Sequence, residues 1–237
     1  MTTSCWGVVV AAGRGERFGG NRPKALIELA GTPLVVHAVR SLRAGGCMGI
    51  VVAAAADLVS VMADRLRESG VTGAALVPDP VVVVAGGSTR QRSVSAALEA
   101  VPDDVRWVLI HDAARPLAPT SVVRAVRSAL SGGAAAVVPV VAVVDTIKSV
   151  APDGLITATV DRSGLRRAQT PQGFERAVLI RALEMSSRSG HELTDDAAAV
   201  AALDIPILTV PGDERSLKIT TPADLVIAEA LLTRSPS

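Results

Sequence analysis

The loop at residues 10–24 carries small residues and cations in a pattern that suits phosphate binding. It follows an apolar predicted strand, contains Gly13 and Gly15, and ends at Lys24. Small residues let backbone N–H groups approach an anion closely, and the side chains of Arg17 and Lys24 could reach a triphosphate folded over the loop. A glycine-rich loop alone is equally compatible with a tight turn, but these two cations at this spacing favour phosphate binding.

Two better-known phosphate loops are excluded by the residues that follow. A Walker A loop ends in Gly-Lys-Ser/Thr, and this loop does not. A dinucleotide-binding fingerprint requires a third glycine where Phe18 stands and then a helix, whereas residues 19–23, which end in Pro23, resist helix formation. The sequence therefore predicts an extended loop.

A second glycine-containing segment, residues 85–93, precedes a predicted helix. Gly87 could present its backbone N–H to a base or a phosphate at the N-terminus of that helix. Ser93 could bond the ligand or simply cap the helix, and taken alone the capping role is the safer interpretation.

A third segment, residues 109–116, lies at the carboxyl end of a predicted central strand, where open α/β sheets place their ligands. Asp112 could hold Mg²⁺ or a ribose hydroxyl, and Arg115 could meet an acceptor phosphate as a fork. The alternative is an Asp112–Arg115 pair that only organises the loop. We interpret His111 as structural, because a phosphate monoester nucleophile is already ionised at neutral pH and needs no base.

Further polar groups are scattered through the second half of the chain, at residues 145–148, 161–162, 170–172, 194–196 and 218–220. Each has a simple structural interpretation when considered alone. Thr194 could cap the helix that follows it, and Arg162 could sit in a hairpin turn. Lys218 could be a charge at the end of a short edge strand.

Short Val/Ala runs alternate with amphipathic segments along the chain. The runs predict buried strands at residues 8–11, 50–53, 74–77, 105–110, 135–140 and 205–210. Predicted helices occupy residues 34–44, 58–69, 92–100, 120–130, 174–187, 195–202 and 222–232. This alternation indicates an α/β fold with an open, mostly parallel sheet covered by helices on both faces. Residues 145–172 interrupt it with a polar hairpin, in which 157–160 and 165–170 flank a turn, inserted as an arm into a single domain spanning residues 1–237.

Composition restricts the partners of the protein. The 237 residues are 49% hydrophobic but include no Tyr, two Phe and two Trp, so few rings are available to stack nucleic-acid bases. A net charge of +1 provides no basic field for a polyanion, and the longest apolar stretch is too short to span a bilayer. Cys5 and Cys47 are expected to be reduced, partly buried thiols. We therefore expect a cytosolic (cytoplasmic) protein with no nucleic-acid or membrane partner.

Taken in order, these segments resemble the 2-C-methyl-D-erythritol 4-phosphate cytidylyltransferases of the non-mevalonate isoprenoid pathway. The resemblance extends from Val8 to about Leu232 and is carried by residues 13–24, 111–116, 168–172 and 217–220. It implies a Rossmann-like nucleotidyltransferase fold, with CTP as co-substrate and Mg²⁺ as metal, and transfer of CMP to a small polyol phosphate with release of pyrophosphate. It also implies a homodimer in which the arm clasps the partner subunit and completes its acceptor site.

The resemblance implies roles for individual residues. Charge stabilisation is assigned to Arg17, Lys24 and Lys218. The CTP-binding positions are Ala11, Ala12, Gly13, Gly15, Gly87, Ser93, Asp112 and Ala113, and Asp112 is also the expected metal partner, directly or through water. The acceptor-binding positions are Arg115, Thr146, Arg162, Thr170 and Thr194. Phe18 stands where the family often has Met, and Ser88 stands where an acid is common, so Ser88 is assigned no role.

Three alternative functions stay open at this point. A sister enzyme would use the same loop but would act on ribitol phosphate or a sugar phosphate. A nicotinamide-dependent oxidoreductase is disfavoured by the missing third glycine and by Pro23. A catalytically silent nucleotide-binding regulator is disfavoured because Arg17, Lys24 and Lys218 occur together.

Overall fold

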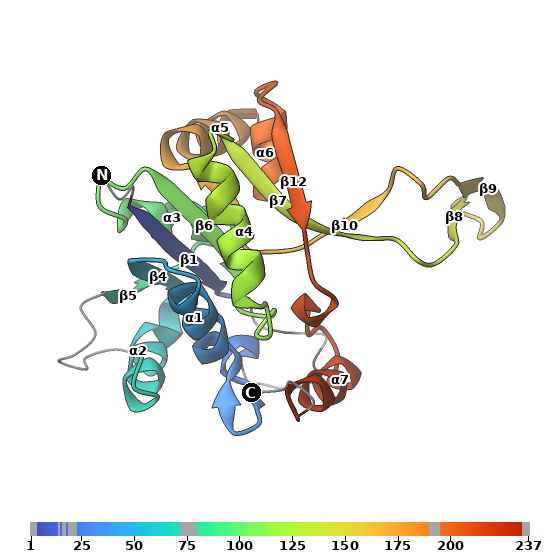
Figure 1. Ribbon diagram of the computed structural model, residues 1–237. Coiled ribbons are helices and arrows are strands. Elements are labelled where there is room, and N and C mark those ends of the chain that lie inside the picture. Colours follow the sequence, from blue (N-terminus) through green and yellow to red (C-terminus); the bar gives the residue numbers. More distant parts are fainter. Residues whose placement is uncertain are drawn as a thin grey trace.

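In the computed structural model, which describes residues 4–13, 15, 18, 23–71, 80–189 and 195–233, an eight-stranded sheet runs through the molecule (Figure 1). Its strands lie in the order β10-β7-β11-β6-β1-β4-β5, and β12 pairs with β7. Their bounds are β1 Cys5–Ala11, β4 Gly49–Ala54, β5 Val81–Ala85, β6 Trp107–Asp112, β7 Ala136–Ala142, β10 Arg166–Ala168, β11 Gln172–Glu175 and β12 Ile207–Pro211. Strands β6, β1, β4 and β5 are parallel, whereas β10 and β11 are antiparallel to their neighbours. The α/β class is confirmed.

Helices cover both faces of this sheet. In the described part of the chain they are α1 Leu34–Ala44, α2 Val59–Glu68, α3 Arg90–Glu99, α4 Thr120–Ser131, α5 Arg176–Ser189, α6 Asp196–Ala201 and α7 Pro222–Thr233. Helices α1 and α4 lie on one face, and α3 and α5 lie on the other (Figure 1). Neighbouring residues of β1 point to opposite faces, so Val9 joins the core under α1 and α4 while Val8 joins the core under α3 and α5.

The sequence pattern located most of these elements correctly. Helix α1 has the predicted bounds, and α2, α3, α4, α6 and α7 begin within two residues of them. The predicted strand at 74–77 lies outside the described residues, and β5 was not predicted. Helix α5 begins at Arg176 rather than at residue 174, because residues 172–175 form β11 between β6 and β7, with Phe174 fully buried.

The predicted hairpin exists, but its pairing was wrong. Strand β8 (Ile147–Val150) pairs with β9 (Ile156–Val160), and together they project far from the body of the molecule (Figure 1). The segment that was expected to pair with 157–160 forms β10 instead, and it pairs with β7. The chain leaves the body along β7 and returns along β10, so these two strands hold the base of the arm together.

The remaining elements of the described part of the chain are a short hairpin and three single helical turns. A short hairpin, β2 (Glu28–Leu29) and β3 (Thr32–Pro33), follows the one-turn helix η2 (Lys24–Leu26). Two further single turns are η3 (Ala56–Leu58) and η4 (Glu214–Ser216). Leu29, Ile219 and Ala228 share one buried cluster. This packing holds the segments that carry Lys24 and Lys218 beside one another.

The core is mainly aliphatic, as predicted, although Phe174 is fully buried within it. Cys5 and Cys47 are free thiols, and both are fully buried rather than partly buried, with exposed fractions of 0% and 2%. No helix in the described ranges combines the length and apolar character that crossing a bilayer requires.

Candidate active site

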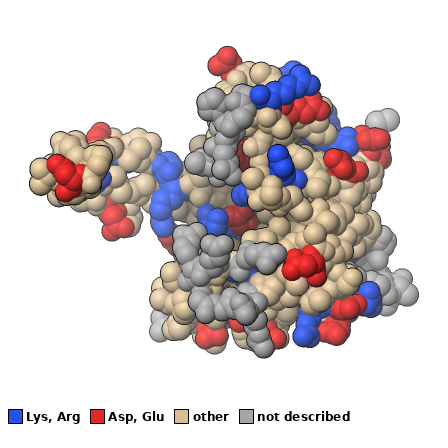
Figure 2. Space-filling model, turned by 180° about the vertical axis from the view of Figure 1, so that it is seen from behind, with Lys and Arg blue, Asp and Glu red and all other residues tan. Residues whose placement is uncertain are grey.

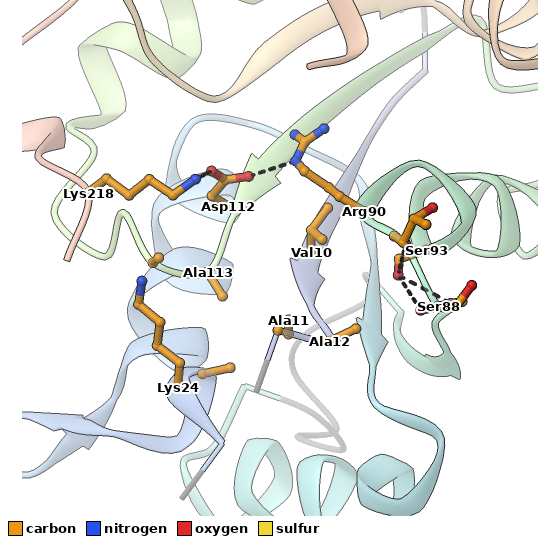
Figure 3. Close-up of a pocket in the computed structure, with 15 residues that line it drawn as sticks. Val10, Ala11, Ala12, Lys24, Ser88, Arg90, Ser93, Asp112, Ala113 and Lys218 are labelled. Carbon is orange, nitrogen blue, oxygen red and sulfur yellow. Dashed lines mark hydrogen bonds and ion pairs between the residues drawn. The ribbon is translucent and has the colours of Figure 1, made fainter. Parts of the chain in front are cut away.

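A cavity of about 250 Å³ opens at the carboxyl ends of β1 and β6, where the phosphate-binding segments were predicted to meet. Predicted residues from four separate segments line it: Ala11, Ala12, Gly13, Lys24, Gly87, Ser93, Asp112, Ala113 and Lys218. Figure 3 shows the side chains of Lys24 and Lys218 extending towards the same part of the cavity, beside Asp112 and Ala113. The fold therefore joins the predicted nucleotide-binding loop, the glycine pair and the end of β6 in one place.

Asp112 lies at the end of β6 between two cations. Its Oδ2 atom is 2.8 Å from Nζ of Lys218, and its Oδ1 atom is 3.3 Å from Nε of Arg90 (Figure 3). Burial by itself would raise the pKa of Asp112, but the charges of Arg90 and Lys218 hold it well below the ordinary value. Asp112 is therefore an ionised carboxylate with a fixed orientation.

Lys218 was predicted to end a short strand, and this was wrong. Residues 217–220 form no strand; they follow η4 as an irregular segment. The backbone N–H of Ile219 donates to the carbonyl of Ala114, and this bond ties the segment to the loop after β6. Lys218 therefore reaches Asp112 from a segment that its own neighbours anchor beside the cavity.

Arg90 is a cavity residue that the sequence analysis did not single out. It is the first residue of α3, and its Nη1 atom lies 2.7 Å from Oδ2 of Asp196, whose side chain is 2% exposed. Burial raises the pKa of Asp196, and the charge of Arg90 opposes that shift. The only sequence signal for Arg90 is its position three residues after a glycine pair, and that spacing is not specific.

Ser93 does not cap α3, contrary to the interpretation of that residue taken alone. The N-cap is Thr89, whose side chain accepts a hydrogen bond from the backbone nitrogen of Arg92. Ser93 lies one turn into the helix, where its hydroxyl donates to the carbonyl of Thr89 at 2.9 Å and accepts from the backbone nitrogen of Gly87 at 3.2 Å. The Ser93 side chain thus holds the glycine loop against the helix.

Close packing requires two of the three predicted glycines, Gly15 and Gly87, whereas a Cβ atom at Gly13 would meet nothing within 4 Å. A Cβ atom at Gly87 would lie 2.3 Å from Cβ of Arg92. Gly15 adopts a φ of +73°, in the left-handed region, and a Cβ there would lie 2.8 Å from Cβ of Lys24. Gly15 does not line the cavity itself, but it lets the loop fold against Lys24.

Thr170 is buried behind the end of β6 rather than exposed in the cavity. Its hydroxyl oxygen accepts from the backbone nitrogen of Asp112 at 3.1 Å and lies 2.8 Å from Nδ1 of His111. Burial is the main cause that lowers the pKa of His111 to about 4, so its imidazole is neutral at pH 7. This placement agrees with a structural role for His111.

The sequence left open an Asp112–Arg115 pair that only organises this loop, and that alternative was wrong. The side chain of Arg115 forms no ion pair with Asp112, whose arginine partner is Arg90. Arg115 instead donates from Nη1 to the carbonyl of Ser216 at 2.6 Å and from Nη2 to the carbonyl of Ala168 at 3.3 Å. It therefore connects the loop after β6 with the segment that carries Lys218 and with the base of the arm.

The predicted acceptor residues of the arm lie apart from the cavity of their own chain. Thr146 and Arg162 are exposed, and Arg162 donates from its guanidinium to the carbonyl of Val144. Figure 2 shows basic side chains gathered where the arm joins the body, and β10 contributes the exposed Arg166 and Arg167 there. Arg17 and Thr194 lie outside the described residues.

Comparison with known proteins agrees with this geometry. Residues 5–234 match the family described as 2-C-methyl-D-erythritol 4-phosphate cytidylyltransferase. A protein of that name from Frankia casuarinae is 49% identical over 228 residues, which cover 96% of this chain and 80% of the relative. Another of that name, from Nocardia farcinica, is 46% identical and is covered to 93% of its length, with 96% of this chain aligned.

Solved structures give the same result. The crystal structure of 4-diphosphocytidyl-2C-methyl-D-erythritol synthase from Anaerococcus prevotii superposes with a TM-score of 0.82 at 25% identity, covering 98% of this chain and 99% of that one. The 2-C-methyl-D-erythritol 4-phosphate cytidylyltransferase from Thermus thermophilus superposes with a TM-score of 0.75 at 33% identity, covering 95% and 98%.

The Rossmann-like sheet, the glycine loops and the lysine-lined cavity define a nucleotidyltransferase, and its relatives make it a cytidylyltransferase. The chain belongs to the 2-C-methyl-D-erythritol 4-phosphate cytidylyltransferase family. The comparisons give no support to a nicotinamide-dependent oxidoreductase or to a ribitol-phosphate enzyme.

Proposed function

We propose that this cavity transfers CMP from CTP to 2-C-methyl-D-erythritol 4-phosphate, giving 4-diphosphocytidyl-2-C-methyl-D-erythritol and pyrophosphate. The observation that carries the residue assignment is the convergence of Lys24 and Lys218 beside Asp112 at the carboxyl end of β6. Two ammonium groups in one partly enclosed cavity suit a triphosphate, and the glycine loops allow close approach of its oxygens.

In the proposed reaction, a phosphate oxygen of the acceptor attacks the α-phosphorus of CTP. A new oxygen–phosphorus bond forms, the bond from the α-phosphorus to the bridging oxygen breaks, and pyrophosphate leaves with that electron pair. Lys24, together with Arg17, stabilises the β- and γ-phosphates, and Lys218 stabilises the α-phosphate. No base is required, because the attacking phosphate is already ionised; positioning and fixed positive charge supply the acceleration.

Lys218 must exchange partners in this scheme. It is paired with Asp112, but its side chain is 44% exposed, so it can turn from the carboxylate to the α-phosphate with little cost of desolvation. The exchange frees Oδ2 of Asp112 while Oδ1 stays beside Arg90. A carboxylate oxygen then faces the cavity at the place where the phosphates are expected.

We propose Mg²⁺ as the metal of this reaction, with Asp112 as its protein partner, directly or through water. Within the described part of the chain there is no group of three or more metal-ligating side chains, and Asp112 is the acidic residue of the cavity. One carboxylate suits a Mg²⁺ ion that is held mainly by phosphate oxygens and water. When bound, Mg²⁺ offsets the negative charge of the two phosphorylated substrates.

We propose that the acceptor is held by Arg115 and Thr194 of one subunit and by Thr146 and Arg162 on the arm of its partner. Thr170 was expected to join them, but it is buried and its hydroxyl is bonded to Asp112 and His111, so it supports the site from behind. The projection of β8 and β9 away from their own body supports this arrangement, because Thr146 and Arg162 lie at the ends of this hairpin, apart from the cavity of their own chain. Exposed apolar side chains on the arm, including Val144, Leu155 and Ile156, supply surface for contact with a partner. The proposed assembly is therefore a homodimer. The proposed location is the cytosol, as the sequence leads us to expect.

Pyrophosphate release tests the reaction. The protein is incubated with CTP and Mg²⁺, and with 2-C-methyl-D-erythritol 4-phosphate or ribitol phosphate as parallel acceptors. We expect release with the first acceptor only. Release with ribitol phosphate alone would transfer the function to the sister enzyme, and release with neither would refute the proposed reaction.

A further inference from the structure

Arg90 joins the cavity to a buried carboxylate on a different helix. From the start of α3 its guanidinium reaches Asp112 at the end of β6 with Nε and Asp196 at the start of α6 with Nη1. Asp112 and Asp196 lie on different elements, and Arg90 bonds both of them. A planar guanidinium with donors on two sides is the side chain that can bridge two carboxylates in fixed directions.

The contact with Asp196 is the stronger of the two and also the more buried. It measures 2.7 Å, and Asp196 is 2% exposed, whereas Nε of Arg90 lies 3.3 Å from Asp112. A buried carboxylate without a cation carries a large cost in free energy, so Asp196 keeps Arg90 in this position. Arg90 is consequently held from behind and presents its Nε–H to Asp112.

The two cations beside Asp112 therefore differ in kind. Lys218 is 44% exposed, comes from an irregular segment and, among the described residues, forms an ion pair with Asp112 alone. Arg90 is 29% exposed, lies at the start of a regular helix and is bound to Asp196. When Lys218 turns to a phosphate, Arg90 is the side chain that keeps Asp112 in place.

We propose that Arg90 is a positioning residue for the transfer reaction, which holds the carboxylate of Asp112 in its working orientation, and that Asp196 in turn holds Arg90. The inference rests on the proposed function of the cavity. It assigns Arg90 no contact with the reacting atoms, and it gives Asp196 a role that is carried wholly through Arg90.

Two single variants and the double variant separate the orientation of the Asp112 carboxylate from effects of net charge and of stability. Arg90→Met removes the bridge and leaves Asp196 buried without its cation, so the melting temperature should fall. Asp196→Asn alone should be milder, because Arg90 keeps Asp112. The double variant Arg90→Met/Asp196→Asn has the net charge of the wild type and no unpaired buried carboxylate, so it should recover most of the lost stability. It still lacks the bond that orients Asp112.

The decisive readouts are the melting temperature, kcat with both substrates saturating, and the equilibrium Kd for CTP. We expect the double variant to have a melting temperature near that of the wild type, a kcat lowered roughly tenfold or more, as misplacement of a site group produces, and a Kd for CTP changed far less. Arg90→Lys keeps the charge but can reach only one carboxylate, so its kcat should lie between that of Arg90→Met and that of the wild type. The exposed pair Arg65–Glu68 of α2 supplies the control Arg65→Gln/Glu68→Gln, which should leave all three quantities unchanged.

Three outcomes overturn the inference. If kcat recovers together with stability in the double variant, Arg90 serves the fold alone. If the Kd for CTP rises as much as kcat falls, Arg90 binds the nucleotide directly. If the wild type itself releases no pyrophosphate from CTP with the acceptor, the proposed function fails, and the inference fails with it; the wild-type control thus distinguishes the two failures.

Discussion

The hydroxyl oxygen of Thr170 lies 2.8 Å from Nδ1 of His111 and accepts a hydrogen bond from the backbone nitrogen of Asp112. A hydroxyl has one proton and two lone pairs. The Thr170 oxygen can therefore accept from Asp112 and still bond Nδ1 of the neutral imidazole in either histidine tautomer. The segment before β11 is thereby fastened to the end of β6, beneath the carboxylate of the cavity.

Thr170→Val tests this connection. Valine keeps the shape of threonine but removes the hydroxyl, so Nδ1 of His111 and the backbone nitrogen of Asp112 lose their partners in a buried place. We expect a loss of about 1–3 kcal/mol in the free energy of unfolding, together with a lower kcat. Thr170→Ser keeps both hydrogen bonds and is the matched control. Equal stability of the valine and serine variants in denaturant titrations would contradict the prediction.

The pH dependence of stability should report His111. Its pKa falls from the ordinary value of 6.5 to about 4 in the folded protein, mainly because of burial. The unfolded chain therefore binds a proton below pH 6.5 that the folded chain refuses until about pH 4. The contribution of His111 to the free energy of unfolding is fully present above pH 6.5. It is lost as the pH is lowered through this window, by up to about 1.4 kcal/mol per pH unit.

His111→Asn is the variant that isolates this effect. The asparagine amide offers both a donor and an acceptor, so it can bond the Thr170 hydroxyl in place of Nδ1, but the side chain does not titrate. We expect the free energy of unfolding of the variant to depend less steeply on pH between 6.5 and 4. His37, whose pKa burial also lowers, remains in both proteins, so its contribution cancels in the comparison. Identical slopes for wild type and variant would refute the assignment.

Sequence reasoning succeeded where the signal is local. The period of apolar residues gave the bounds of α1, because that helix buries a continuous stripe that includes Leu34, Val35 and Leu42. The cavity residues of β1 and β6 were found because ligands of open α/β sheets gather at the carboxyl ends of strands. In both cases the physical cause lies within a few consecutive residues.

Sequence reasoning failed where the partner is distant in the chain. Arg90 and Asp196 are 106 residues apart, and neither belongs to a motif that would pair them. The arm has turn residues at both 151–154 and 161–164, so composition could not decide whether β9 pairs with the strand before it or the strand after it. The correct pairing depends on β7, which supplies β10 with a partner in the main sheet.

Lys24→Ala should separate catalysis from folding. Removing one contact to developing negative charge typically costs ~2.7–4 kcal/mol of barrier, which corresponds to a roughly 10²- to 10³-fold lower kcat. Lys24 lies on η2 at the edge of the cavity, so we expect only a small change in melting temperature. Arg124→Ala, which removes an exposed cation of α4, is the control and should retain full activity. A folded Lys24→Ala protein with near-wild-type turnover would be incompatible with the proposed role.

Mixing two inactive variants should show whether the arm works on the partner subunit. Lys24→Ala disables the cavity of its own chain, and Arg162→Ala disables the arm. If the arm completes the site of the partner, a mixed dimer combines the intact cavity of one chain with the intact arm of the other and has one working site of its two. Random exchange in an equal mixture should then restore about a quarter of the wild-type activity.

The subunit exchange itself must be verified, for example by the transfer of an affinity tag between the two variants. If the arm instead served its own cavity, every site in every dimer would carry one of the two substitutions, and mixing would restore nothing. The exposed position of Thr146 and Arg162, apart from the cavity of their own chain, leads us to expect recovery. A verified exchange without recovered activity would therefore require that Arg162 reach the cavity of its own subunit.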